Sequence, residues 1–164
     1  MNRKAITEEL SCLTEKHINP INDTRVYWAK EVTFDYRTEN QIRVDYMHFV
    51  PMNNTISGIE HGDFYCYEIK SSVEDFNSKN GHNFIGDFNY YVMPCEVYEK
   101  VKNNIPYGIG VYVPFTDDFQ VKHLRSVKTA RRSVREKPLT EMLFMMFRSA
   151  NREIEKIRRS QNND

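Results

Sequence analysis

The sequence carries no net charge. Its 164 residues include 23 Lys and Arg and 23 Asp and Glu, so the formal charge at pH 7 is zero when His is neutral. A protein with this balance has no overall basic field to attract nucleic acid. Any electrostatic attraction to a partner must therefore come from a local cluster of charges.

Cysteine is scarce, and its spacing matches no metal motif. Cys12, Cys66 and Cys95 form no CxxC and no His-paired zinc pattern, and the histidines are scattered. We therefore expect no zinc site, and we expect the cysteines to be packing residues. An odd cysteine count, together with an N-terminus too polar for a signal peptide, favours a reducing, cytoplasmic location.

Long apolar runs are also missing, since no stretch approaches the ~20 residues that span a bilayer. We expect no membrane partner. The chain is instead rich in aromatic residues, with 10 Tyr and 10 Phe in a sequence that is 40% hydrophobic. Length and composition predict a single domain over residues 1–164 with a core of moderate size.

Hydrophobic periodicity predicts a mixed α/β sheet with helices on both sides. We expect helices over 3–17, 72–79, 95–104 and 138–159, and strands over 26–36, 42–50, 64–70, 88–94 and 107–114. A further short strand or extended arm is expected over 119–126. The first two strands form a hairpin, and the run 64–70 is apolar enough for a central strand buried on both faces.

Three charged residues interrupt these apolar strands. Asp45 lies in the second strand, and Glu68 and Lys70 share one face of the third because strand side chains alternate. If the strands are neighbours, the three converge at one end of the sheet. Two carboxylates there repel each other unless a divalent cation joins them, and Mg²⁺ binds to one or two carboxylates with waters and phosphate oxygens. Lys70 would position a water or neutralise charge on the phosphate.

The segments RVDYMHF (43–49) and GDFYCYEIKSSVEDFNSK (62–79) resemble the core of the PD-(D/E)XK nuclease superfamily. Asp45 takes the place of the first acid, and Glu68-Ile69-Lys70 that of the (D/E)-x-K motif, whereas Val44 stands where the motif has Pro. The match is closer still to the MmcB-like DNA-repair group, and it covers roughly residues 25–155. The resemblance implies a restriction-endonuclease-like fold, Mg²⁺ (or Mn²⁺) held by Asp45 and Glu68, and cleavage of DNA to a 5′-phosphate and a 3′-hydroxyl.

Many nucleases of this kind add an acid from the first helix. Glu8 and Glu9 are the candidates here, and Glu9 is slightly preferred as a catalytic residue. Glu31 in the first strand is a further candidate. A solvated helix face explains Glu8 and Glu9 equally well, so these alternatives stay open.

Four residues around the third and fourth strands have two interpretations each. Ser72 is first a helix cap and second a contact to a DNA phosphate. Lys79 follows Asp75 by four residues, which favours an ion pair on a helix, with DNA contact as the alternative. Asp87 and Tyr90 either frame the rim of the site or act as a strand-end cap and a core aromatic.

A basic run precedes the last helix. Residues 122–137 contain seven basic residues against Glu136 alone: Lys122, Arg125, Lys128, Arg131, Arg132, Arg135 and Lys137. Contacts to phosphates are mainly electrostatic and independent of sequence. We expect Arg125, Lys128, Arg131, Arg132 and Arg135 to clamp the DNA backbone beside the cleavage site. The alternative is a solvated linker or a surface for an acidic partner.

Two functions follow from this reading. The first is a metal-dependent deoxyribonuclease acting in DNA repair or in the processing of mobile-element or phage DNA. The second is a catalytically inactive scaffold of the same fold that binds DNA or a protein. Without a recognition domain, specificity would come from a homodimer or from a protein partner.

Overall fold

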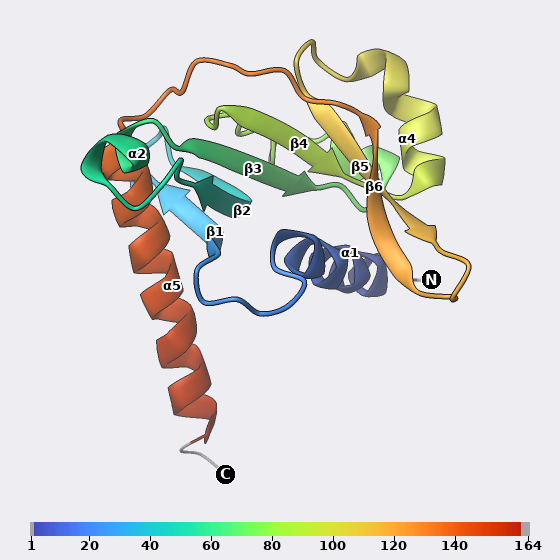
Figure 1. Cartoon of the computed structure of the whole chain (residues 1–164). Helices are drawn as coiled ribbons and strands as arrows, with labels where there is room; N and C mark the ends of the chain where they lie inside the picture. The colour runs from blue at the N-terminus through green and yellow to red at the C-terminus, as the bar shows by residue number, and fades with distance from the viewer. Residues whose placement is uncertain (1, 162–164) are drawn as a thin grey trace.

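The fold is built on one six-stranded sheet, seen in a computed structural model that describes residues 2–161 (Figure 1). Residues 1 and 162–164 of the expected domain lie outside the described part. The strands are β1 (Tyr27–Phe34), β2 (Ile42–Val50), β3 (Asp63–Ile69), β4 (Phe88–Val92), β5 (Gly110–Thr116) and β6 (Lys122–Lys128). The helices are α1 (Arg3–Ile18), α2 (Ile56–Glu60), α3 (Val73–Phe76), α4 (Cys95–Val101), the 3₁₀ turn η1 (Lys102–Asn104) and α5 (Leu139–Gln161).

The strands lie in the sheet in the order in which they occur in the chain. β1, β2 and β3 pair antiparallel, β3, β4 and β5 pair parallel, and β5 and β6 pair antiparallel. The expected hairpin and the expected mixed sheet flanked by helices are confirmed, and this architecture is consistent with a restriction-endonuclease-like fold. The neighbouring pair β2–β3 matters most, because it carries Asp45 and Glu68.

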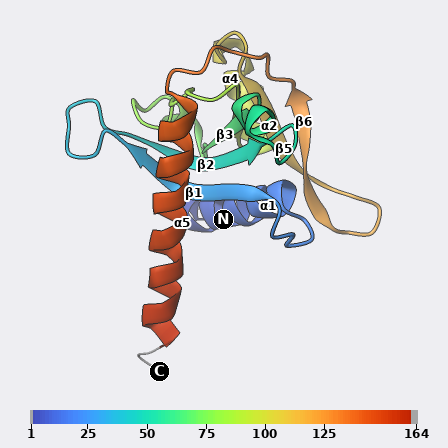
Figure 2. The same cartoon turned by 60° about the vertical axis from the view of Figure 1, so that its left-hand side comes forward.

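Helices cover both faces of the sheet (Figures 1 and 2). α1 covers one face with Leu10 and Leu13, which pack in a cluster with Tyr67, Tyr90 and other sheet residues. α5 packs on the other face over β1 and β2, and α4 covers β4 and β5 on that same face. Burial from both sides explains why β3 reads as an almost continuous apolar run.

Several expected boundaries were wrong. Residues 51–63, where no helix was expected, contain α2, which is capped by the Thr55 hydroxyl. The helix expected over 72–79 ends at Phe76, and the last two strands begin three residues later than expected. Polar capping residues such as Thr55 favour both turns and helix starts, so composition alone does not separate them.

Within residues 2–161, no helix has the length and apolar character needed to cross a membrane.

Candidate active site

Asp45 and Glu68 come together on the adjacent strands β2 and β3. The Asp45 carboxylate is partly buried, and its Oδ2 accepts a hydrogen bond from the backbone N–H of Ile69 at 2.9 Å. This bond fixes Asp45 at the carboxyl end of β3, one residue beyond Glu68. Burial raises the pKa of Asp45, and the positive charges of Arg43 and Lys70 partly offset that rise.

Glu68 is the most unusual acid in the structure because it is almost fully buried, with 1% of its surface exposed. Its Oε1 accepts a hydrogen bond from the Asn83 side-chain amide at 3.2 Å. Its Oε2 has no hydrogen-bond partner among the described residues. Burial raises the pKa of Glu68 well above its usual value, and the negative charge of Asp45 raises it further. A buried carboxylate without partners is costly unless it is protonated or binds a cation.

Lys70 follows directly after β3 and is 2% exposed. Its Nζ donates hydrogen bonds to the backbone carbonyls of Asn80 at 2.5 Å and Asp75 at 3.3 Å. These bonds account for two of the three ammonium protons and leave the third for a water or a substrate oxygen. Burial lowers the pKa of Lys70, although the carboxylates of Asp75, Glu68 and Asp45 favour its charged form.

The backbone of Gly81 packs closely against Glu68 and Lys70. A Cβ placed on this residue would lie 2.8 Å from Lys70 Nζ and 3.1 Å from Glu68 Oε2. A larger residue here would therefore push against both functional atoms. The backbone of Gly81 also has a φ of 68°, in the left-handed region that favours glycine.

The site opens into a cavity of about 590 Å³. Arg3 and Thr7 line it from α1, Arg43 and Asp45 from β2, and Lys79 from the loop after α3. Arg3 closes one side through an ion pair with Asp75 at 3.0 Å. A second cavity of about 420 Å³ also includes Asp45, and Glu31 and Glu153 contribute further acids to its wall.

The donor set suits a cation that needs few protein ligands. Among residues 2–161, no group of three or more His, Cys, Asp or Glu side chains is arranged to hold a metal ion. Asp45 and Glu68 are two carboxylates, and Mg²⁺ commonly binds to one or two with waters completing its shell. The unpartnered Glu68 Oε2 beside Asp45 fits such an ion.

The acid expected from the first helix is not at this site. Glu9 forms an ion pair with Lys122 of β6. Glu8 is exposed, and its Oε1 lies 3.9 Å from Lys4 Nζ. The face of α1 toward the cavities carries Arg3, Thr7, Ser11 and Glu15 instead, and the carboxylate of Glu15 accepts a hydrogen bond from the Tyr46 hydroxyl. The preference for Glu9 is therefore wrong in position, because the helix points that carboxylate toward β6. Glu31, the candidate from the first strand, does lie near Asp45, since both residues line the second cavity.

Ser72 caps α3, as the simpler reading expected. Its hydroxyl accepts a hydrogen bond from the Asp75 backbone N–H at 3.1 Å.

Lys79 does not pair with Asp75, because α3 ends at Phe76 and the i,i+4 geometry is lost. Lys79 is exposed and lines the cavity, where a phosphate contact is open to it.

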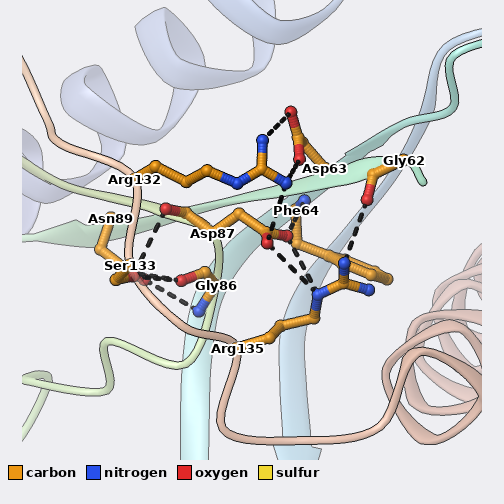
Figure 3. A network of polar contacts seen from close by, with 9 residues as sticks. All are labelled: Gly62, Asp63, Phe64, Gly86, Asp87, Asn89, Arg132, Ser133 and Arg135. Carbon is orange, nitrogen blue, oxygen red and sulfur yellow. Dashed lines mark hydrogen bonds and ion pairs between the residues drawn. The ribbon is translucent and has the colours of Figure 1, made fainter.

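Arg132 and Arg135 belong to a network of polar contacts around Asp63 and Asp87 (Figure 3), and this network lies at the other end of β3 from the site. Arg132 binds to Asp63 through two bonds of 2.5 and 3.2 Å, and Arg135 lies 3.2 Å from Asp87. Asp87 also accepts the backbone N–H of Phe64, so this acid caps the amino end of β3 rather than framing the rim of the site. β3 runs about 20 Å from Asp63 to Ile69 at ~3.3 Å per residue. The expected clamp beside the cleavage site is thus wrong for these two arginines.

The other members of the basic run are also engaged locally. Lys128 donates to the carbonyls of Ile105 and Pro106, and Arg131 binds to the Tyr107 hydroxyl. Arg125 is exposed, and its guanidinium lies over the Phe115 ring at 5.8 Å. Together with the contacts of Arg132 and Arg135, these bonds hold the segment 131–137 against the amino ends of β3 and β4.

Sequence reasoning missed Asn83 and Gly81. The Asn83 amide holds Glu68 and also donates to the Arg43 carbonyl at 2.8 Å, so it fixes β2 and β3 relative to each other. The Asn80-Gly81 dipeptide is a recognisable turn signal. That signal predicts a tight turn, but it does not indicate which side chains the turn approaches.

In comparisons with known proteins, the chain matches no family model, no curated protein and no solved structure.

Proposed function

We propose that this chain is a metal-dependent deoxyribonuclease that hydrolyses phosphodiester bonds at Asp45, Glu68 and Lys70. One observation carries the proposal: the buried Glu68 has an unpartnered Oε2, and the Lys70 ammonium lies beside the same glycine, Gly81, as that oxygen. A sequence has little reason to bury an acid and a lysine this way for stability alone, because unpaired buried charge is destabilising.

Asp45 and Glu68 would hold Mg²⁺, with Mn²⁺ as a substitute, through Glu68 Oε2 and the Asp45 oxygen that Ile69 does not occupy. When bound, the ion lowers the pKa of a coordinated water and stabilises charge on a phosphoryl oxygen. Positive charge at the carboxylates would also offset the burial that raises the pKa of both acids, and the negative charge of Asp45 that raises the pKa of Glu68 further.

Lys70 would orient the attacking water and stabilise charge on the phosphate. Two carbonyls fix its Nζ, and its remaining N–H is open to such a group. Burial lowers its pKa, so it releases a proton more readily than an exposed lysine. Only the neutral amine could accept a proton from water, and the lowered pKa increases the share of that form.

DNA is the proposed substrate on the basis of the sequence resemblance and the polar cavity. Arg43 and Lys79 are exposed cations in its wall and would contact backbone phosphates. A role in DNA repair or in phage or mobile-element DNA processing, and a cytoplasmic location, stay predictions from the sequence.

The test is cleavage of labelled single-stranded, duplex, flap and junction DNA with Mg²⁺, Mn²⁺ or EDTA. We expect metal-dependent cleavage by wild type and a loss of about 10²–10⁴-fold in Lys70→Ala, the range for a lost acid–base group. Asp45→Asn and Glu68→Gln should also lose cleavage, together with Mn²⁺ binding measured by calorimetry. Matched controls are Lys100→Ala and Asp118→Asn, which alter exposed residues outside the cavity.

Wild type that neither cleaves any of these DNAs nor binds Mn²⁺ would contradict the proposal. Binding of DNA without cleavage would then favour the inactive scaffold.

A further inference from the structure

α5 has a second apolar stripe beside the one that it buries. Met142, Met146 and Ser149 are buried against the sheet. The second stripe consists of Leu143, Phe147, Ala150, Ile154 and Ile157, whose spacing alternates between four and three residues. This is the spacing of a coiled-coil seam, with Phe147 and Ile154 at position a and the other three at position d.

Three of the five residues of the stripe are exposed, whereas Leu143 and Ala150 are half-buried. Phe147 is 62% exposed, Ile154 47% and Ile157 58%. The C-terminal half of α5 extends beyond the sheet (Figures 1 and 2), and every residue over 151–161 except Glu153 is exposed. A helix that leaves such a row of apolar side chains in water is typical of one that pairs with another helix.

Charges beside the stripe indicate what it pairs with. Glu153 is at position g, and Arg158, five residues later, is at position e of the following heptad. When two copies of the helix lie parallel and in register, each g side chain lies across from that e side chain of the other copy, so two Glu153–Arg158 pairs form. Antiparallel helices set g against g and e against e, and no opposite charges then meet along this stripe.

The sheet edge offers a matching apolar surface. A cavity of about 590 Å³ lies between α5 and the β1–β2 edge, and its walls include Trp28, Phe49, Leu143 and Phe147. In a parallel pair, the e side of the second helix faces the g side of the first, which is the side on which this cavity lies. Phe144 is at position e and is 56% exposed in one copy. The pairing would thus cover Phe144 and the cavity together.

We propose that the chain forms a homodimer through parallel, in-register pairing of α5, with Phe144 of each copy facing the apolar cavity of the other. Glu153 also lines the second cavity at Asp45, so the dimer brings Arg158 of one copy next to the candidate site of the other. The dimer does not depend on nuclease activity, and it is tested without any substrate.

The first test is the molar mass of the full chain by light scattering and sedimentation velocity. We expect twice 19.6 kDa for wild type. Ile154→Asp/Ile157→Asp should raise the dissociation constant at least about 100-fold, because it places charge in a surface that is buried only in the dimer. Both residues are exposed in one copy, so circular dichroism should show an unchanged fold. A monomeric wild type at the highest soluble concentration, or a double variant that still dimerises, would overturn the proposal.

A charge exchange tests the register and direction of the helices. Glu153→Arg and Arg158→Glu should each weaken the dimer, because each change sets like charges across the seam. The double variant should restore dimerisation, and an equal mixture of the two single variants should form heterodimers. The double variant also loses any contact that Glu153 makes within its own copy, so only pairing between copies explains a rescue. Failure of both rescues would contradict parallel, in-register pairing.

Discussion

At the scale of single residues, Glu68 shows the conflict between stability and the proposed activity. Its side chain is buried, one oxygen binds to Asn83, and the other has no partner in the described part of the chain. The folded protein therefore resists ionisation of this carboxyl, and its pKa rises well above the ordinary 4.5. The folded state then binds the Glu68 proton more tightly than the unfolded state does.

Glu68→Gln should stabilise the metal-free protein at neutral pH. Because the folded pKa is raised, the Glu68 contribution to stability is greatest below the unfolded pKa and falls as pH rises toward the folded pKa. The amide cannot ionise, so the variant should lack this decline. We expect the variant to gain about 1–3 kcal/mol at neutral pH and almost nothing below the unfolded pKa. Urea unfolding in EDTA across this pH range measures the difference.

The control for this change is Glu96→Gln, which alters an exposed carboxyl in α4. It should leave the pH dependence of unfolding unchanged. A Glu68→Gln variant that is less stable than wild type at neutral pH would show that the charged form of Glu68 is structurally required.

At the scale of elements, the sequence was most informative where periodicity and burial agree. β2 and β3 were predicted as strands, and their pairing brings Asp45 and Glu68 together as expected. Hydrophobic patterning indicates which residues of a strand face the core. It therefore predicted correctly that Asp45 and Glu68 lie on neighbouring strands. It does not determine the rotation of α1 finely enough to separate Glu9 from Thr7, which lines the cavity.

The basic segment shows a different limit of sequence reasoning. Arg132 and Arg135 looked free because the local sequence holds few acids, but their partners Asp63 and Asp87 lie far away in the chain. Such pairs depend on the packing of the segment across the amino ends of β3 and β4 (Figure 3). Local charge counts predict a surface cluster, whereas only the tertiary fold reveals whether the cluster is already neutralised.

Asp87→Ala should be strongly destabilising. Asp87 is buried, and it accepts the Phe64 N–H at 2.9 Å while it pairs with Arg135. Its removal leaves a buried donor and a poorly exposed guanidinium without partners, which costs about 3–5 kcal/mol. The exposed pair between Asp63 and Arg132 should matter much less, so Asp63→Ala should cost about 0–1 kcal/mol. Guanidinium unfolding of both variants checks the contrast, and equal losses would contradict this view of the network.

At the scale of the whole molecule, zero net charge conceals two different groups of cations. One group, with Arg132 and Arg135, is bound by acids at the amino end of β3. The other, with Arg43 and Lys79, lines the cavity at its carboxyl end, where the Arg43 guanidinium makes only a long ion pair of 3.9 Å with Glu31. Counterion release depends only on cations that neutralise phosphates. If the proposed function holds, DNA affinity should therefore depend on the second group.

We expect Arg43→Ala and Lys79→Ala to weaken DNA binding and reduce the slope of log K against log salt by about 0.7–0.9 each. Fluorescence anisotropy in an Asp45→Asn background measures this slope without cleavage. Arg132→Ala should change it no more than the control Lys100→Ala, because Arg132 is already held by Asp63. The opposite pattern would mean that DNA exchanges with Asp63 for this arginine and crosses the basic segment. In that case DNA would bind about 17 Å from Glu68, at ~3.3 Å per residue along β3 from Asp63, and binding and cleavage would no longer share one site.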